Sequence, residues 1–193
     1  RSSLSLSVVG MLLFIGIWGN INNVYHIISE DYLPGKMVIF YIGMSNLFDI
    51  ALGVSPHIIV NSKYYKNLSY FMVVFAVFLI VSNLLLIPEF GIVGAAIASL
   101  ISKFLFNGIK FLFLYRKFGF QPFDMKFPLL ILISLLSYWL STFIPPLPNF
   151  ILDILVRSAA ITVLFGLPVY YFKVSEDINA KVNDTLLKLK AMI

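Results

Sequence analysis

Residues 84–118, LLLIPEFGIVGAAIASLISKFLFNGIKFLFLYRKF, predict two apolar helices joined by a sharp reversal. Pro88 has no amide hydrogen to donate and Gly91 tolerates a positive φ, so the backbone can turn between the two helices. The helix expected over residues 91–115 is about 37 Å long at ~1.5 Å per residue, enough to cross a bilayer core of about 30 Å. A buried helix of a soluble protein rarely runs this long with only two lysines as charges. We therefore expect a membrane hairpin.

The second helix of this hairpin carries small residues on one side, in two adjacent rows with a spacing of four. In lipid, small side chains allow a neighbouring backbone to approach closely, so this side is the expected packing face. The rows are Gly91, Ala95 and Ser99, and Gly94, Ala98 and Ser102.

The composition of the whole chain is that of an integral membrane protein. Its 193 residues are 60% hydrophobic and 12% charged, whereas soluble domains average roughly 45–50% and 25%. The net charge of +5 comes from basic residues between apolar runs, where they orient a membrane protein, so nucleic acid is not an expected partner. The chain has no cysteine, and His26 and His57 lack partners at metal-ligand spacing. We expect neither a metal nor a cofactor.

Six apolar segments with short connections predict an all-α fold, a polytopic bundle of six membrane spans. No segment shows the alternation of a membrane β-strand. One transmembrane bundle, residues 1–172, is expected before a cytoplasmic tail, residues 173–193. The expected spans are residues 4–28, 37–60, 68–87, 91–115, 127–144 and 150–172.

Lysines and arginines predict the orientation of the bundle, because cytoplasmic loops carry an excess of them. With Arg1 in the cytoplasm, the opposite side holds a single lysine, Lys36, near Glu30, Asp31 and Glu89. Both ends of the chain are therefore expected in the cytoplasm. The cytoplasmic basic residues are then Lys63, Lys66, Arg116, Lys117, Lys126, Lys173, Lys181, Lys188 and Lys190.

The tail has apolar residues at helical spacing, and Ser175 before Glu176 and Asp177 is a suitable N-cap. This pattern predicts an amphipathic helix on the inner leaflet, with a short coiled-coil contact as the alternative. The apolar positions are Ile178, Val182, Leu186, Leu189 and Ile193.

Asp49 is the most informative charge, because it lies near the middle of the segment 37–60. A carboxylate at the centre of a membrane helix costs roughly 2.5–3.5 kcal/mol on insertion scales, so it is expected to face protein or water. It belongs to a polar stripe at helical spacing, formed by Ser45, Asn46, Asp49, Gly53 and Pro56. A transport role and a structural pairing role are both open for Asp49.

Lys103 lies about 18 Å along its helix from Gly91, also near mid-depth, and Asn107 is one turn further on the same face. We expect Asp49 and Lys103 to face one interior cavity, where they either pair or bind a substrate and a coupling ion. The candidate residues of this cavity are Asn46, Asp49, Lys103 and Asn107. Lys110 is expected to extend to the inner interface, without a function.

Two further polar groups receive simpler interpretations. The run from Gly19 to Asn23 either lines the mouth of an outer cavity or forms interhelical hydrogen bonds near the interface. Asp153 and Arg157 are spaced four apart near the outer end of the last span, so we expect a structural ion pair.

The middle of the chain resembles the C-terminal part of bacterial oligosaccharide flippases of the polysaccharide biosynthesis family, in the superfamily of multidrug and toxin exporters. The most specific element is NLLLIPEFGIVGAAIASLIS, residues 83–102. The other elements, in chain order, are GMSNLFDIALGV (43–54), IIVNSKYYKN (58–67) and YRKFGFQPF (115–123).

The resemblance implies a fold of about fourteen helices, of which this chain would be the last six, so we expect a piece of a longer protein. It implies alternating access that flips a lipid-linked oligosaccharide across the bacterial inner membrane, with H⁺ or Na⁺ as the coupling ion. The expected partners are that substrate, membrane lipids and the missing N-terminal half.

The sequence contains no catalytic motif, such as a P-loop or G-x-S-x-G, so an enzyme is not expected. The closest alternative function is a drug exporter of the same superfamily. A membrane-bound glycan acyltransferase would need a midplane histidine, whereas His26 and His57 are expected near the interfaces. A membrane scaffold without transport activity is the remaining alternative.

Overall fold

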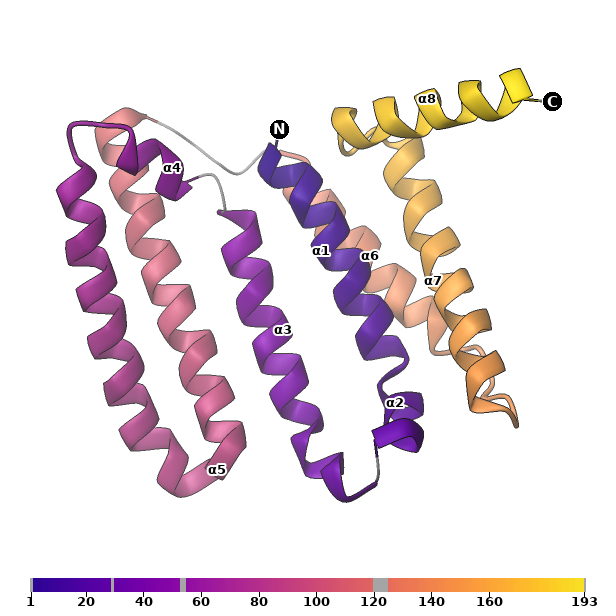
Figure 1. Cartoon of the computed structure of the whole chain (residues 1–193), viewed down its shortest axis with the longest axis horizontal. Helices are drawn as coiled ribbons and strands as arrows, with labels where there is room; N and C mark the ends of the chain where they lie inside the picture. Colours follow the sequence, from indigo (N-terminus) through magenta and orange to yellow (C-terminus); the bar gives the residue numbers. More distant parts are fainter. Residues whose placement is uncertain (1, 29, 53–54, 120–124, 193) are drawn as a thin grey trace. The chain divides into compact units, whose positions relative to one another are not determined.

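The computed structural model describes residues 2–28, 30–52, 55–119 and 125–192 and places most of them in helices (Figure 1). The predicted all-α class is confirmed, because the structure is 88% helical and the residues it describes contain no strand. Arg1, Gly53 and Ile193, which entered the predictions above, lie outside the described residues.

The chain divides into two compact units. The first, here called the terminal unit, combines Arg1–Val24 with Phe123–Ile193, and the second, the central unit, is Tyr25–Pro122. Each unit has its own helix contacts, so the fold is described one unit at a time.

In the central unit, α5 (Tyr65–Phe118) is a hairpin of two helical arms (Figure 1). The arms meet at Gly91, whose dihedrals of φ 56° and ψ −135° are not helical and would strain any residue with a Cβ atom. Ring contacts join residues at similar distances from Gly91 along the two arms, so the arms are antiparallel. These contacts are Phe71 with Phe113, 5.2 Å between ring centroids, and Phe75 with Phe106, 4.9 Å. The reversal predicted from the sequence is confirmed.

Close to the reversal, the two arms approach each other at Gly94. A Cβ atom at this position would lie 2.1 Å from the carbonyl oxygen of Leu86 and 2.6 Å from its carbonyl carbon. The small row that starts at Gly94 continues with Ala98 and Ser102, and all three residues are buried. This row is thus a packing face, as expected for small residues between helices.

Alanine at Gly94 is expected to push the arms apart, because its Cβ has no space beside the backbone of Leu86. Overpacking of this kind costs typically about 1–3 kcal/mol. Gly108→Ala is the matched control, since a Cβ atom there meets nothing within 4 Å and alanine favours a helix over glycine by about 1 kcal/mol. Thermal unfolding of the purified protein in detergent should show a lower Tm for Gly94→Ala only. Equal Tm values for both variants would contradict the close approach.

The segment 37–60, predicted as one span, consists of two helices in the structure. After η1 (Glu30–Gly35) comes α3 (Lys36–Ala51), with Leu52 as its C-cap, and α4 (Ser55–Val60) begins three residues after Leu52. Pro56 is the second residue of α4, where its missing amide hydrogen breaks no helical hydrogen bond. Both α3 and α4 contact α5.

The terminal unit is built from α1 (Ser2–Gly19), α6 (Phe127–Ser141) and α7 (Phe150–Tyr171), which contact one another. α6 and α7 begin at the predicted residues and end within three residues of the predicted ends. α8 (Glu176–Met192) follows α7 after a sharp corner and also contacts α1 (Figure 1).

The segment 4–28, also predicted as one span, is divided at Asn20 into α1 and α2 (Ile21–Ile28). The side chain of Asn20 donates from Nδ2 to the carbonyl oxygen of Gly16, at 2.8 Å. Asparagine often bonds to nearby backbone in this way, in competition with the regular helix. The polar residues that were read as part of a long span therefore mark its end.

The tail is helical, and Ser175 caps it as predicted, with its Oγ accepting from the amide of Ile178 at 3.3 Å. Ser5 of α1 holds this end of the tail, with hydrogen bonds of 2.8 Å to Ser175 Oγ and Asp177 Oδ2. The amphipathic character of α8 stays a prediction. The side chains of Leu186 and Leu189 lie outside what the structure describes.

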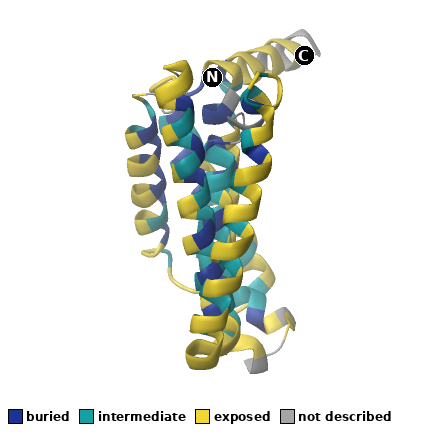
Figure 2. Ribbon diagram, turned by 90° about the vertical axis from the view of Figure 1, so that its left-hand side faces the viewer, coloured by how far each residue is buried: buried dark blue, intermediate teal, exposed yellow. Residues whose placement is uncertain are grey.

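Within the described residues, two helices, α5 and α7, are long and apolar enough to cross a membrane, while α1 and α6 are apolar but shorter. α5 in particular exposes large hydrophobic side chains along its length, among them Val73, Leu84 and Ile92 (Figure 2). Such a surface suits lipid better than water. The arrangement of six spans stays a prediction.

Candidate functional site

The four candidate residues of the sequence analysis lie together in the central unit, between α3 and the second arm of α5. The ammonium of Lys103 lies 2.8 Å from Asp49 Oδ2 and donates to Asn46 Oδ1 at 2.7 Å. Asn107 donates from Nδ2 to the other carboxylate oxygen of Asp49, at 2.9 Å. Of the two predicted alternatives for these charges, pairing or binding a substrate and coupling ion, the structure shows the pairing.

Helix geometry explains why Asp49 needs these partners. α3 ends at Ala51, so Asp49 lies in the last turn, where the helix dipole disfavours a negative charge. The depth of Asp49 was predicted from a helix running to Val60, and this count does not hold. Its position along the hairpin is given instead by its contact with Lys103, which lies near the middle of the second arm.

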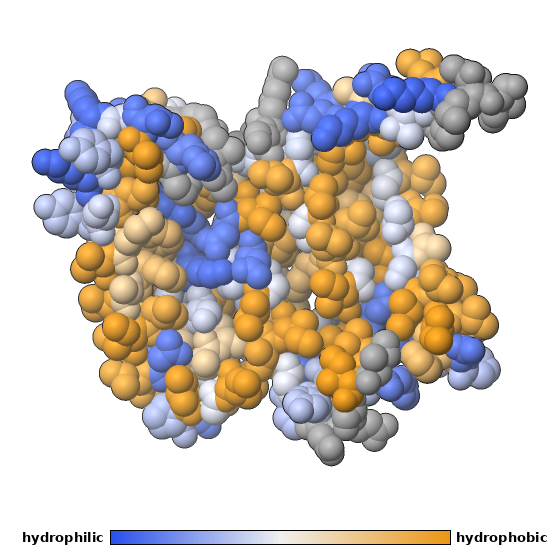
Figure 3. All heavy atoms as spheres, in the orientation of Figure 1, coloured by the Kyte–Doolittle hydropathy of each residue, from blue (hydrophilic) through white to orange (hydrophobic). Residues whose placement is uncertain are grey.

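The ion pair is accessible from outside the central unit. The side chain of Lys103 is 26% exposed and that of Asp49 is 39% exposed. In Figure 3 a hydrophilic patch lies over α3 and α5, with hydrophobic residues around it. A polar patch in such surroundings can receive a charged or hydroxyl-rich ligand without opening the fold.

Asn107 is less exposed to solvent than the ion pair that it contacts. Its side chain is buried, and its Oδ1 has no hydrogen-bond partner among the described residues. Ser102, buried on the same arm, likewise has an unpartnered Oγ. Buried polar atoms are normally hydrogen-bonded, so the Oδ1 of Asn107, beside the ion pair, indicates a place where water or a ligand group would bind. Ser102 belongs instead to the buried small row that starts at Gly94.

Lys110 is a residue of this region that the sequence analysis interpreted wrongly. It was expected to extend to the inner interface, but it is only 4% exposed. Its ammonium lies 4.2 Å from the ring centroid of Phe106, a cation–π contact, and the Asp49 carboxylate attracts it electrostatically. The missed signal was the spacing of Lys103, Asn107 and Lys110, which places all three on one helix face.

The chemistry of this site is that of a receptor for polar or anionic groups. The ammonium of Lys103 contacts the Asp49 carboxylate, that of Lys110 is attracted to it from its place over Phe106, and two asparagines supply amide donors and acceptors. Among the residues that the structure describes, no three His, Asp or Glu side chains gather to hold a metal ion. The site therefore offers hydrogen bonds and charge, with Asp49 as its titratable acid.

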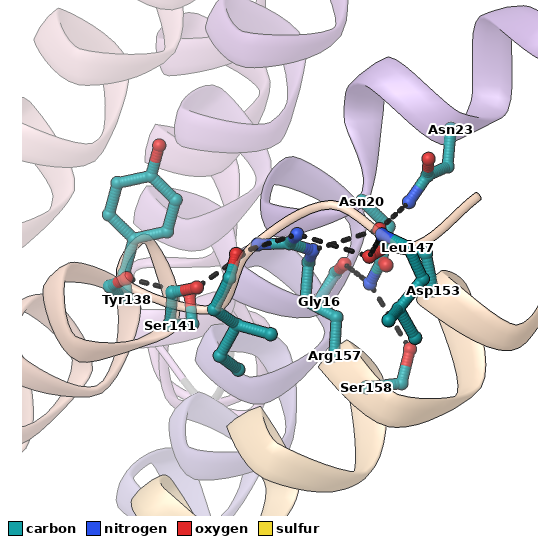
Figure 4. A network of polar contacts seen from close by, with 10 residues as sticks. Gly16, Asn20, Asn23, Tyr138, Ser141, Leu147, Asp153, Arg157 and Ser158 are labelled. Atoms are coloured by element: carbon teal, nitrogen blue, oxygen red, sulfur yellow. Dashed lines mark hydrogen bonds and ion pairs between the residues drawn. The ribbon is translucent and has the colours of Figure 1, made fainter. Parts of the chain in front are cut away.

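A second polar network lies in the terminal unit, around Arg157 of α7 (Figure 4). Arg157 forms the predicted ion pair with Asp153, 3.2 Å between Nε and Oδ2. It also donates to the carbonyl oxygens of Ser141 and Ile144, at 3.0 and 3.2 Å, and so caps the end of α6.

Both carboxylate oxygens of Asp153 accept hydrogen bonds in this network. The side chain is 3% exposed and accepts from the amide of Leu147, at 3.1 Å, and from the side chain of Asn23. Asn20 donates to Ser158 Oγ at 3.1 Å. Of the two interpretations of the asparagine run, the structure shows interhelical hydrogen bonds for Asn20 and Asn23. The charges of this network are paired and little exposed, so it fastens helices together. The buried Oδ1 of Asn20 is an atom of this network without a hydrogen-bond partner among the described residues.

No protein-family model, no curated protein and no solved structure matches this chain. What it does must therefore be argued from the two polar clusters and their surroundings.

Proposed function

We propose that this chain is the C-terminal portion of a transporter that flips a lipid-linked oligosaccharide across the bacterial inner membrane. The observation that carries the proposal is the Asp49–Lys103 pair, a half-exposed charge cluster between apolar helices. Ionisable residues within membrane helices are costly, and they generally mark substrate or ion pathways. The resemblance of residues 83–102 to flippases supplies the substrate class.

The side chains of the site suit the parts of such a substrate. Lys103 and Lys110 would attract the pyrophosphate, as charge-assisted hydrogen bonds to phosphate are strong. Asn46 and Asn107 would bond to phosphate or sugar oxygens. Asp49 would carry the coupling H⁺ or Na⁺, and its release from Lys103 would accompany alternating access between two helix bundles.

The proposed topology has six spans with both ends in the cytoplasm, formed by residues 1–172, and an amphipathic tail on the inner leaflet. The first and second arms of α5 supply two of these spans, and Glu89 lies at the tip between them. The first bundle and part of the second belong to residues outside this chain, so the chain alone is expected to insert without transporting.

Single cysteines test this topology in intact cells. Cysteines at Lys63 and Lys117 are expected to be shielded from membrane-impermeant thiol reagents, because both lie at the cytoplasmic end of the hairpin. A cysteine at Glu89 is expected to react. The reverse pattern would overturn the orientation, and reaction at all three positions would exclude the proposed spans.

Variants of the ion pair test the function in the proposed full-length transporter. Asp49→Asn and Lys103→Ala are expected to reduce glycan export much more than membrane abundance, since a partly exposed pair contributes only about 1 kcal/mol to stability. Glu89→Gln is the matched control, an acidic residue of the same hairpin that lies outside the site. Export and abundance are measured together for each variant.

A purely structural pair gives a different result. In that case each single variant lowers the abundance, and the exchanged pair, Asp49→Lys with Lys103→Asp, restores both abundance and export. Unchanged abundance and export in both single variants would refute any role for the cluster. Normal glycan export with loss of drug resistance would favour the exporter.

A further inference from the structure

We infer that the open end of the α5 hairpin holds a binding site for the headgroup of an anionic phospholipid, centred on Tyr64. This inference rests on the membrane insertion proposed above, but it concerns different residues from the Asp49 cluster. Tyr64 is the residue immediately before the first arm, and the second arm ends near it at Phe118.

Two lysines that are far apart in the sequence lie over the ring of Tyr64. The ammonium of Lys63 lies 5.2 Å from the ring centroid and that of Lys117 lies 5.7 Å from it. Like charges repel, so their common position depends on attraction to the electron-rich face of the ring. The orientation of membrane loops requires basic residues on the cytoplasmic side, but it does not require them to converge on one ring.

Packing fixes the ring in place. Phe113 and Phe118 of the second arm contact Tyr64 edge-on, with 5.7 and 5.8 Å between ring centroids. Ser62 holds the preceding turn, because its Oγ accepts from the amide of Tyr64 at 3.1 Å and donates to the carbonyl oxygen of Ile59 at 2.8 Å. The lysines are therefore presented by a formed turn.

Beneath this turn, Ile59 of α4 packs against Leu68 and Leu114, one residue from each arm. All three residues are buried, and Phe71 and Phe113 pack against them. The turn that carries the two lysines thus lies over a small hydrophobic core that joins α4 to both arms.

The positive charge at this end of the hairpin has no counterion within the described part of the central unit. Lys66 and Arg116 add to the charge of Lys63 and Lys117, and none of the four forms an ion pair there. Asp49 is engaged by Lys103, and Glu89 lies at the opposite end of the hairpin. An anion from outside the unit is needed to balance the charge.

The position of these basic residues at the end of the hairpin favours an anionic lipid as the partner. If the hairpin spans the membrane, its ends lie at headgroup depth, where tyrosines are enriched. Tyr65 and Tyr115 flank the cluster, and each is 55% exposed. Basic residues next to membrane helices attract anionic lipids by about 1 kcal/mol each. The phosphodiester of phosphatidylglycerol therefore fits both the charge and the depth of this site.

The test is competition between lipids on the full chain, measured by native mass spectrometry after purification with equal amounts of phosphatidylglycerol and phosphatidylcholine. Lys63→Gln with Lys117→Gln is expected to lower the ratio of bound phosphatidylglycerol to phosphatidylcholine by roughly tenfold or more. Lys66→Gln with Arg116→Gln removes the same charge at the same end, away from the Tyr64 ring, and is expected to change the ratio much less. Equal losses in both double variants would show diffuse surface attraction and overturn the site.

A second pair of variants tests the ring without changing the charge. Tyr64→Phe keeps an aromatic face and is expected to preserve the lipid ratio, whereas Tyr64→Leu is expected to lower it. Preservation in both variants would refute the role of the ring. If the proposed membrane insertion is wrong, the wild-type chain will retain neither lipid, whereas retention of both lipids without preference would refute this inference alone.

Discussion

The reversal of the backbone at Gly91 is the constraint on which the central unit depends. Because glycine accepts a positive φ there, two long apolar helices lie antiparallel, with their backbones in close approach at Gly94. The second arm then presents one polar face to α3, with Lys103, Asn107 and Lys110 in successive turns. The same reversal brings the two ends of the hairpin together, where Lys117 meets the turn that carries Tyr64.

Two ion pairs among the described residues have opposite characters, although each joins an aspartate to a basic residue. The pair of Asp153 and Arg157 is little exposed and has several further hydrogen bonds, so it fastens α6, α7 and the residues between them. The pair of Asp49 and Lys103 is partly exposed, and the Asn107 side chain that contacts it has an unpartnered acceptor. Removing one partner of a buried pair typically costs about 3–5 kcal/mol, whereas an exposed pair contributes little stability. Exposure therefore distinguishes the pair suited to binding from the pair suited to folding.

Local chemistry made part of this structure predictable. Three predicted features depend only on a few neighbouring residues, and the structure contains all three. They are the reversal at Gly91, the helix cap by Ser175 and the ion pair of Asp153 with Arg157. The grouping of Asp49 with Lys103 was predicted from the cost of charges in apolar helices.

The predictions that differ from the structure needed more than local pattern. Hydropathy joined α1 to α2 and α3 to α4, because apolar residues continue past Asn20 and Leu52 while the regular helix does not. Lys110 was assigned to the interface because distance along the helix was considered without the direction of its side chain. Its contact with Phe106 depends on the rotation of the second arm about its own axis. Packing against α3 and the first arm fixes this rotation.

The most direct test of the account is whether α3 lies against the second arm of α5 in the membrane. Phe48 and Phe104 mark this contact, with 5.2 Å between their ring centroids. Cysteines at these two positions, in native membranes, should be joined rapidly by a short thiol cross-linker. Phe48→Cys with Ile92→Cys should not, because Ile92 is about 18 Å from Phe104 along the arm. Equal cross-linking of both pairs, or none at Phe48 and Phe104, would contradict the arrangement that forms the site.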